Sequence, residues 1–412
     1  MHSGLGTSSR QAEASLKHLD KLRIIENENE VEKPKVERHP AHLEIKEHIA
    51  ELLERAPITD REKKVQVDDV YLFQTGMASI YSLHTWLIEH FNSEQKSVLF
   101  GFAFHHTVHV FNYFGPGYKF LGKGDENDLL ELEIFLKEEK AAGRKVQALW
   151  AEYPSNPLIV TPNLAKLRKL ADKYGFLLII DDTIASFCNV DVLDFADVLV
   201  TSLTKSFSGY ADVMGASTVL NPSSNRYAEL KDLFARKFQD EYSNGDAIQL
   251  ESNSRSYLYR SAILNNNALR LVEYFQTQAA DPKSCVTGVF YTTTSPSSLE
   301  NYKSTMRKPT ENFEPGYGCL FSIEFEHVEQ TIAFYDNLNV HHGPHLGAHL
   351  TLALPYVRGL YNNDLEWAGR YDMRVTQLRI AVGLEDTEEL LEVFKSAVEI
   401  AEKAVIGAGE AQ

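Results

Sequence analysis

The sequence predicts an α/β fold: a mostly parallel sheet with helices between its strands, followed by a smaller α+β unit. Continuous apolar runs of strand length, such as those at 176–181 and 198–203, are typical of strands buried on both faces. Amphipathic stretches of helical spacing separate these runs along the chain. After about residue 257 the regular alternation ends, which indicates a second unit with another arrangement.

The elements of the first unit are expected in a simple order. A polar arm over residues 1 to about 34 precedes a helix at 42–53, whose apolar positions share one face. The sheet is expected from strands at 70–73, 96–104, 146–153, 176–181 and 198–203. Its helices are expected at 75–91, 128–143 and 164–175, the last two closed by Gly143 and Gly175.

The C-terminal part is expected to begin with a long helix at 257–275. Strands at 319–325 and 377–382 and an amphipathic closing helix at 387–405 complete it. We therefore expect three regions: an N-terminal arm and helix (1–63), a large domain (64–257) and a C-terminal domain (258–412).

The composition is that of a globular protein with an acidic surface. Hydrophobic residues make up 43% of the chain, and 41 Lys and Arg against 58 Asp and Glu give a net charge of −17. Such a charge repels phosphate backbones and anionic lipid, so nucleic acids and membranes are not expected as partners. The sequence has no run of about 18 apolar residues and no apolar signal core at its start, which favours a cytoplasmic protein.

The positions of the cysteines and histidines argue against stabilising disulfide bonds and against a metal site. Cys188, Cys285 and Cys319 lie far apart without a CxxC pair, which excludes a disulfide scaffold and suits a reducing compartment. Histidines gather at 105–109 and 341–349, and His345 and His349 have the i, i+4 spacing of a helical metal pair. Because a glycine stands between these two and no HExxH motif occurs, no metal is expected.

Residues 152–217 hold the groups that point to chemistry. Asp181 closes one apolar strand, and Lys205 follows the next strand, flanked by Ser202 and Thr204. Ligand-binding groups of α/β sheets gather at such strand ends. By spacing alone, Lys205 could equally be a lysine of a surface loop. The aspartate favours a site, because carboxylates at the end of buried strands are rare unless paired.

Several motifs resemble those of the Cys/Met-metabolism family of pyridoxal 5′-phosphate enzymes. The family includes cystathionine γ-synthase, cystathionine lyases, methionine γ-lyase and O-acetylhomoserine sulfhydrylase. The resemblance implies a fold-type-I, aspartate aminotransferase-like architecture and covers about residues 36–400. SRSYLYR and GLEDTEELLE are similar to the fungal γ-synthase-like branch. The matching motifs are TGMAS at 75–79, PSNP at 154–157, DDT at 181–183 and SLTK at 202–205.

The resemblance implies a role for each matching residue. Lys205 would bond to the cofactor aldehyde and move protons between substrate carbons, and Asp181 would keep the pyridine nitrogen protonated. The start of the helix after the first strand would hold the phosphate. Without the resemblance, that turn would be read as an ordinary connection between a strand and a helix. The implied phosphate and ring contacts come from Gly76, Met77, Ser202, Thr204 and Asn156.

Three residues are expected to bind the substrate. Arg379 matches the arginine that clamps the α-carboxylate, for which a planar guanidinium is suited. By its position alone it could also be a strand-edge arginine paired with an acid. His345 stands where the family has a serine, which implies altered substrate handling, and Thr351 completes the expected set.

Two further positions depart from the family pattern. Its Tyr-x-Arg motif, which reaches the phosphate of the neighbouring subunit, is matched by Val36-Glu37-Arg38, so Arg38 is expected to act without the tyrosine. A second tyrosine, which stacks on the cofactor and transfers protons, is replaced by Phe104. A phenyl ring can stack but cannot carry a proton, which disfavours a lyase.

The expected function is a γ-substitution on an activated L-homoserine, such as its O-acetyl ester. The nucleophile would be cysteine, giving cystathionine, or a carbon nucleophile in natural-product biosynthesis. The alternatives are a γ- or β-lyase acting on cystathionine or methionine, and a catalytically silent scaffold. Retention of Lys205, Asp181 and Arg379 with their hydroxyl neighbours argues against a scaffold. The resemblance also implies at least a homodimer, with a tetramer favoured.

Overall fold

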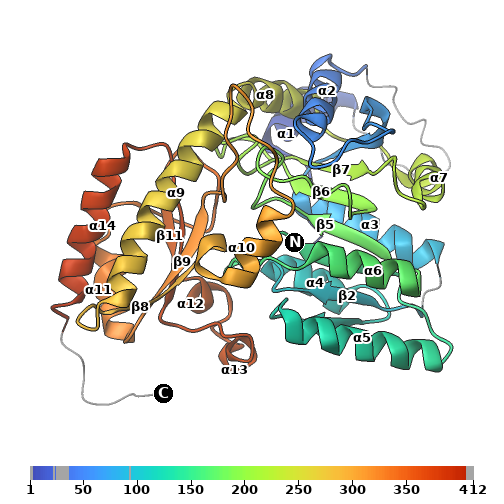
Figure 1. Cartoon of the computed structure of the whole chain (residues 1–412). Helices are drawn as coiled ribbons and strands as arrows, with labels where there is room; N and C mark the ends of the chain where they lie inside the picture. The colour runs from blue at the N-terminus through green and yellow to red at the C-terminus, as the bar shows by residue number, and fades with distance from the viewer. Residues whose placement is uncertain (1–2, 22–23, 25–36, 92–93, 405–412) are drawn as a thin grey trace.

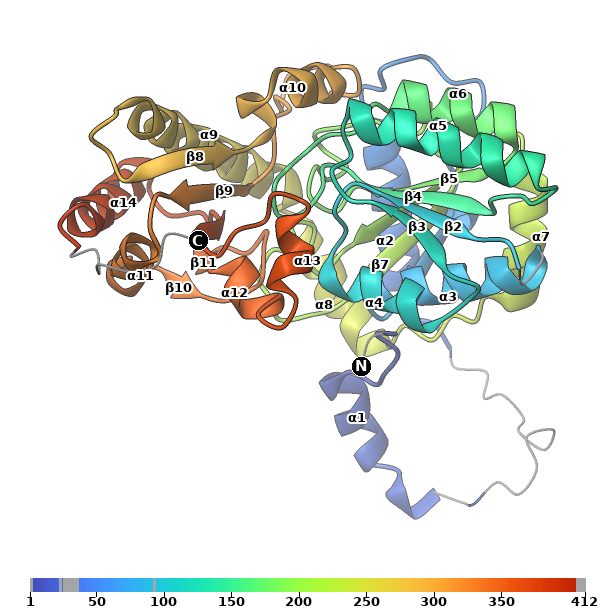
Figure 2. The same cartoon turned by 90° about the horizontal axis from the view of Figure 1, so that it is seen from below.

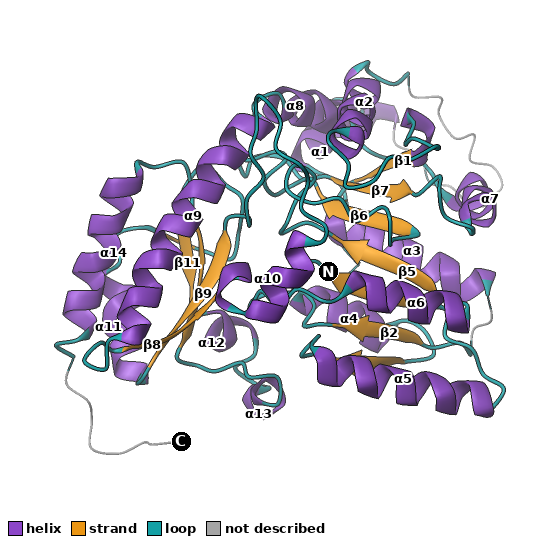
Figure 3. Ribbon diagram, viewed as in Figure 1, coloured by secondary structure: helices purple, strands orange, loops and turns teal. Residues whose placement is uncertain are grey.

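The computed structural model describes residues 3–21, 24, 37–91 and 94–404. Two sheets lie side by side, a larger one of seven strands and a smaller one of five (Figures 1 and 3). The α/β class expected from the sequence is confirmed. The expected arm at 25–34 and the position Val36 fall outside the described residues.

The larger sheet has the order β1-β7-β6-β5-β4-β2-β3. The strands from β6 to β3 pair in parallel, as expected, whereas β7 is antiparallel to both β6 and β1 at the other edge. The strands are β1 (Val70–Phe73), β2 (Ser97–Phe100), β3 (Tyr118–Leu121), β4 (Ala148–Glu152), β5 (Leu177–Asp181), β6 (Val198–Ser202) and β7 (Ala216–Leu220).

Both faces of this sheet are covered, which explains its continuous apolar strands. Alternate residues of one strand enter different cores: Leu178 and Ile180 pack on one face, Leu177 and Ile179 on the other. Figure 2 shows one face under α5 (Glu126–Ala141) and α6 (Leu164–Tyr174). The other face lies under α3 (Gly76–His90), α4 (His105–Tyr113) and α7 (Tyr227–Lys237).

The second sheet has the order β10-β11-β12-β9-β8 and a core of its own. Its strands are β8 (Val286–Phe290), β9 (Leu320–Phe325), β10 (His341–His342), β11 (Leu352–Leu354) and β12 (Gln377–Ala381). Phe275, Phe334 and Phe394 from the covering helices meet in this core. Those covering helices are α9 (Tyr257–Ala280), α11 (Val328–Asn337) and α14 (Thr387–Ala401), and the same part of the chain also contains α10 (Pro296–Lys303), α12 (Tyr356–Leu360) and α13 (Leu365–Gly369). We propose that the domain division near residue 257 falls at the start of α9.

The N-terminal region is partly folded against the larger sheet. Helix α1 (Ser9–Leu16) lies beside α8 (Asn244–Ser254), where Arg10 donates a hydrogen bond to the Asp212 carbonyl at 2.9 Å. Residues 9–16 therefore form a helix within the segment that the sequence predicts as a polar arm. Helix α2 (Ala41–Glu54) packs on α8 through its apolar face, as expected.

An aromatic cluster ties α12 and α13 to the edge of the larger sheet. Trp367 stacks on Phe120 with ring centroids 5.5 Å apart and also meets Phe102 at 5.5 Å and Tyr361 at 5.8 Å. Phe102 lies two residues before Phe104, so the cluster supports the segment that enters the site described next.

Candidate active site

A cavity of about 210 Å³ opens where β4, β5 and β6 end and α3 begins. This is the position expected for a ligand site in an α/β sheet. Residues of the second unit complete its wall (Pro344, Leu346 and Arg379). Nine of the residues expected from the sequence line it: Gly76, Met77, Phe104, Asn156, Asp181, Ser202, Thr204, Lys205 and Arg379.

The start of α3 forms one side of the cavity. Thr75 caps the helix by accepting a hydrogen bond from the Ala78 backbone N–H at 2.9 Å. A Cβ on Gly76 would lie 3.1 Å from the Cβ of Ser202, so glycine lets the helix start approach the end of β6. The backbone N–H groups at a helix start suit a phosphate, and the Ser202 side chain lies beside this one.

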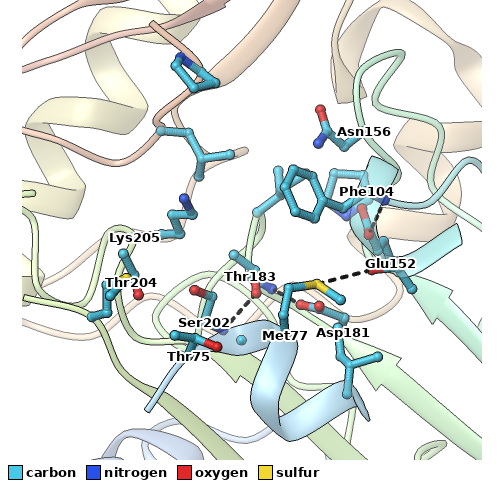
Figure 4. Close-up of a pocket in the computed structure, with 18 of the residues that line it drawn as sticks. Thr75, Met77, Phe104, Glu152, Asn156, Asp181, Thr183, Ser202, Thr204 and Lys205 are labelled. Atoms are coloured by element: carbon cyan, nitrogen blue, oxygen red, sulfur yellow. Dashed lines mark hydrogen bonds between the residues drawn. The ribbon is translucent and has the colours of Figure 1, made fainter. Parts of the chain in front are cut away.

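Lys205 stands in the turn that follows β6, opposite Phe104 and Asn156 (Figure 4). Burial, together with the positive charge of Arg379, lowers the pKa of its ammonium to about 8. A sizeable fraction of the amine is then neutral near pH 8 and able to attack an aldehyde. Thr204 is fixed by hydrogen bonds with the carbonyl and the N–H of Gly215, at 3.2 and 3.1 Å.

The turn around Lys205 is fastened from behind by α9. Arg260 donates hydrogen bonds to the carbonyls of Ser206 at 2.8 Å and Phe207 at 2.9 Å. Gly209 has a φ of +78°, and a Cβ there would collide with the Arg260 guanidinium. The lysine therefore projects from a rigid turn.

Two carboxylates lie together at the floor of the cavity. Asp181 and Glu152 are directly paired across β5 and β4. Burial raises the pKa of both carboxyls, and the charge of Asp181 raises that of Glu152 further. Asp181 accepts a hydrogen bond from the Thr183 backbone N–H at 2.9 Å. A buried anion here would pair with a cationic ring nitrogen.

Glu152 is a site residue that the sequence reasoning missed. It accepts a hydrogen bond from the Phe104 backbone N–H at 2.5 Å and so fixes the chain where Phe104 enters the cavity. The available signal was its place at the end of a predicted strand, two residues before Pro154 of the PSNP motif. The contact with Phe104 spans 48 residues and has no local signature. Thr183 and Pro154 also line the cavity and were not expected.

Asp182 points away from the cavity, as alternation along a strand end requires. It is fully buried and accepts a hydrogen bond from the Thr201 hydroxyl at 2.5 Å. Its other oxygen has no partner among the described residues, and burial raises the pKa of the carboxyl to about 7.

Arg379 projects from β12 and connects the two units. It donates to the Asn156 side-chain oxygen at 3.2 Å and to the Pro344 carbonyl. Its guanidinium lies over the Tyr356 ring, 4.7 Å from the centroid. A planar cation at a cavity wall is suited to bind a carboxylate.

Phe104 contributes the ring opposite Lys205 (Figure 4). It precedes α4 and stacks on His106, with centroids 5.3 Å apart and an interplanar angle of 15°. Tyr113 is 65% exposed and does not line the cavity of its own chain, so it does not supply there the hydroxyl that Phe104 lacks.

Three expected site residues do not line this cavity. His345 lies behind its wall, with Nδ1 3.4 Å from the Lys205 Nζ. Thr351 is fully buried and hydrogen-bonds Glu385 at 2.8 Å and the Gly383 N–H at 2.9 Å, so its observed contacts are structural. Arg38 donates to the Tyr242 carbonyl at 2.8 Å, within its own chain.

Neither metal binding nor membrane spanning is indicated by the described residues. His345 and His349 lie outside any helix, so the spacing noted in the sequence does not form a helical pair. Within the described ranges, no group of three or more His, Cys, Asp and Glu is placed to hold a metal ion. None of the described helices is long and apolar enough to cross a membrane.

The residues present fit pyridoxal 5′-phosphate. The cavity combines a tight glycine at a helix start, a lysine of lowered pKa and a buried carboxylate. These match, in turn, the phosphate, the aldehyde and the ring nitrogen of the cofactor.

The chain is similar to several fungal proteins. It is 40% identical over 369 residues to a cystathionine γ-synthase-like enzyme of Amanita muscaria, covering 87% of this chain and 61% of that protein. It is 38% identical over 341 residues to cystathionine γ-synthase of Neurospora crassa, covering 82% and 52%. It is 35% identical over 384 residues to an alanine racemase of Aspergillus violaceofuscus, covering 90% and 64%. The chain thus spans about half to two thirds of the length of these relatives.

Solved structures share the fold. Cystathionine γ-synthase from Xanthomonas oryzae pv. oryzae, in complex with aminoacrylate and cysteine, superposes with a TM-score of 0.73 at 20% identity and 92% coverage of each chain. Cystathionine γ-lyase from Lactobacillus plantarum, complexed with L-serine, gives 0.70 at 19% identity and 91% coverage of each.

Residues 60–399 match the sequence family described as Cys/Met metabolism PLP-dependent enzyme, which is more than half of the chain. The motifs, the cavity and this match agree on the cofactor, which is pyridoxal 5′-phosphate. The chain belongs to the Cys/Met-metabolism family of pyridoxal-phosphate-dependent enzymes.

Proposed function

We propose that the protein catalyses γ-substitution on an activated L-homoserine, with the O-acetyl ester as the first candidate. The observation that carries the proposal is a cavity that gathers Lys205, Asp181 and Arg379 opposite a phenyl ring at Phe104. When bound, the cofactor supplies an electron-withdrawing ring that stabilises negative charge at the substrate Cα.

Each residue has a task that its surroundings support. Arg379 binds the substrate carboxylate and so orients the Cα–H bond. Lys205, whose lowered pKa leaves part of the amine neutral, accepts and returns the substrate protons. Asp181 would face the ring nitrogen of the cofactor and keep its charge there, because a cation at that nitrogen would offset the burial that raises the pKa of the carboxyl.

Phe104 supports substitution over elimination. A γ-lyase must deliver a proton to the γ-carbon before it releases a keto acid, and the phenyl ring has none to deliver. A substitution enzyme instead joins the γ-carbon to a nucleophile and does not need that proton. We propose cysteine or a carbon nucleophile of natural-product biosynthesis for that role.

Two other activities stand beside this one. A γ- or β-lyase is the alternative within the family, and a relative of the chain bears the name alanine racemase. A silent scaffold would not require the lysine, the carboxylate and the arginine at one cavity. We also propose a cytoplasmic location, since all three cysteines are unpaired and buried.

The test is to incubate the protein with O-acetyl-L-homoserine and a panel of thiols and carbon acids, following products by mass spectrometry. We expect little 2-oxobutanoate alone, and faster acetate release with a γ-substituted amino acid once the right nucleophile is added. Phe104→Tyr should raise the ratio of 2-oxobutanoate to substituted product. Mainly 2-oxobutanoate under all conditions would establish the lyase, and racemisation of L-alanine as the only activity would establish a racemase.

The cofactor lysine is tested separately by borohydride reduction of the cofactor-loaded protein, followed by peptide mapping. We expect the label on Lys205, and none on any lysine in Lys205→Ala. A label on another lysine of the parent protein contradicts the assignment.

The proposed assembly is at least a homodimer, and a tetramer is favoured. Arg38 lies away from the cavity of its own chain, so it could reach a phosphate only in a neighbouring subunit. Mixing Lys205→Ala with Arg38→Ala chains should restore activity through hybrid sites that carry both native residues. A monomer in sedimentation experiments, or no restoration, contradicts shared sites.

A further inference from the structure

The segment 344–347 touches two charged groups of the cavity at once. The Pro344 carbonyl accepts a hydrogen bond from Arg379, and His345 places Nδ1 3.4 Å from the Lys205 Nζ. Pro344 and Leu346, on either side of the histidine, line the cavity. The segment thus bridges the arginine of the second sheet and the lysine turn of the first.

The backbone of this segment is fixed against the lysine turn. Gly347 has a φ of +72°, and a Cβ there would lie only 2.4 Å from the Ser206 backbone nitrogen. Such a contact is impossible for any other residue without displacement of one chain. The position of His345 is therefore determined by the residue directly after Lys205.

The contact with Lys205 sets the tautomer of the imidazole. When Lys205 is protonated, its ammonium has three donors and no acceptor, so Nδ1 then accepts and the imidazole proton lies on Nε2. Burial and the charges of Lys205 and Arg379 lower the pKa of His345 to about 4, so the ring is neutral. Nε2 is buried and has no hydrogen-bond partner among the described residues.

We infer that His345 is a positioning residue for Lys205, which it holds by accepting a hydrogen bond from the amine at Nδ1. The inference rests on the proposed role of Lys205. A hydrogen bond that fixes the amine also fixes the orientation of its remaining N–H groups and its lone pair. A flexible lysine side chain does not fix that orientation by itself.

The acceptor also has a measurable effect on Lys205. A hydrogen bond to the ammonium favours the charged form, so its loss should lower the pKa of Lys205 below about 8. His345→Leu removes the acceptor, whereas His345→Asn retains a side-chain oxygen close to the position of Nδ1. His349→Leu is the matched control, since His349 lies in the same loop and contacts Tyr210.

The test measures the pH dependence of trace reductive methylation of Lys205 in the full chain after its bound cofactor has been removed, by peptide mass spectrometry. We expect the midpoint to fall by about one unit in His345→Leu, tenfold in amine availability, and to stay near the parent value in His345→Asn and His349→Leu. An unchanged midpoint in a folded His345→Leu protein overturns the inference. This outcome is independent of borohydride labelling, so failure of the proposed role of Lys205 is recognised separately.

A second measurement needs no substitution at His345. Nitrogen NMR of the parent protein should show a neutral imidazole protonated on Nε2 with a free Nδ1. The Nδ1 signal should shift in Lys205→Met, which lacks the donor. A ring protonated on Nδ1 overturns the inference even if the leucine variant fails to fold.

Discussion

Asp181 and Asp182 are neighbours in sequence with opposite surroundings. The first lines the cavity, and the second is enclosed in the core against Thr201. The sequence identified Asp181 as the site residue, because it closes an apolar strand within a recognisable motif. It could not identify Glu152 in the same way. The importance of Glu152 comes from its pairing with Asp181 on β5 and from the Phe104 backbone, which only the folded chain brings to it.

Asp181→Asn should impair catalysis far more than cofactor binding. The helix start at Gly76 and the hydroxyl of Ser202 would still hold the phosphate, but the ring nitrogen would lose the charge that keeps it protonated. We expect turnover to fall about 100-fold, with a cofactor dissociation constant near that of the parent. Cofactor titration by absorbance and product formation measure the two effects, and near-normal turnover would show that Asp181 is not the ring partner.

Asp182→Asn should stabilise the protein above neutral pH. The pKa of Asp182 is raised to about 7, so the folded state holds a proton that the unfolded chain releases near pH 4. The free energy of unfolding of the parent therefore loses this contribution as pH rises from about 4 to 7. One pKa unit corresponds to about 1.4 kcal/mol.

Urea unfolding of both proteins at pH 5, 6, 7 and 8 measures this difference. The Asn side chain keeps an oxygen for the Thr201 hydroxyl, so the comparison isolates the titration. The variant should gain stability relative to the parent by more than about 1 kcal/mol between pH 5 and 8. A constant difference across the series contradicts the expected titration.

At the scale of elements, the sequence predicted the long and strongly patterned pieces. The strands at 176–181 and 198–203 and the helix at 257–275 were predictable, because burial on both faces leaves a continuous apolar run and burial of one helix face leaves a helical periodicity. Helix α4 and strand β3 were missed. Their short, aromatic and histidine-rich sequences bury residues irregularly and carry neither pattern. The antiparallel edge at β7 depends on chain reversal, which apolar runs do not encode.

The glycines of two turns give a matched pair of element-scale tests. Gly347→Ala should displace the segment 344–347, because its Cβ would meet the Ser206 nitrogen at 2.4 Å. Gly175 ends α6 at a φ of +78°, and the Cβ of Gly175→Ala would meet nothing within 4 Å. Both should lose about 1 kcal/mol of unfolding free energy through strain, and Gly347→Ala more.

Only Gly347→Ala should also weaken the covalent binding of cofactor to Lys205, as followed by absorbance. Equal cofactor binding by both variants would show that the segment does not control the lysine turn. The urea midpoints of the two variants provide the stability comparison.

At the scale of the whole molecule, the fold class and family were predictable because the motifs lie in order along most of the chain. The arrangement of the two sheets was not. It depends on contacts such as the aromatic cluster, in which Phe102 and Phe120 of one unit meet Trp367 of the other. The sequence around a single aromatic residue in a loop does not predict which other rings it contacts.

Trp367→Ala should therefore destabilise the protein by about 3 kcal/mol, the usual cost of removing a packed large aromatic. It should also reduce turnover, because the cluster supports the segment that leads to Phe104. Ile332→Ala is the control, since Ile332 is 53% exposed on α11 and should change stability by less than about 0.5 kcal/mol. Equal urea midpoints for the two variants contradict the role of the cluster.

The fastening of the lysine turn by Arg260 has a mechanical consequence. Helix α9 has 24 residues and is about 36 Å long, with Arg260 in its first turn and Phe275 embedded in the core of the second sheet. Because α9 contacts both the turn after Lys205 and the core of the second sheet, a rotation of the second sheet would displace Lys205 as well as Arg379. Lys205 and Arg379 would then move together and keep their spacing while the other residues that line the cavity move relative to them.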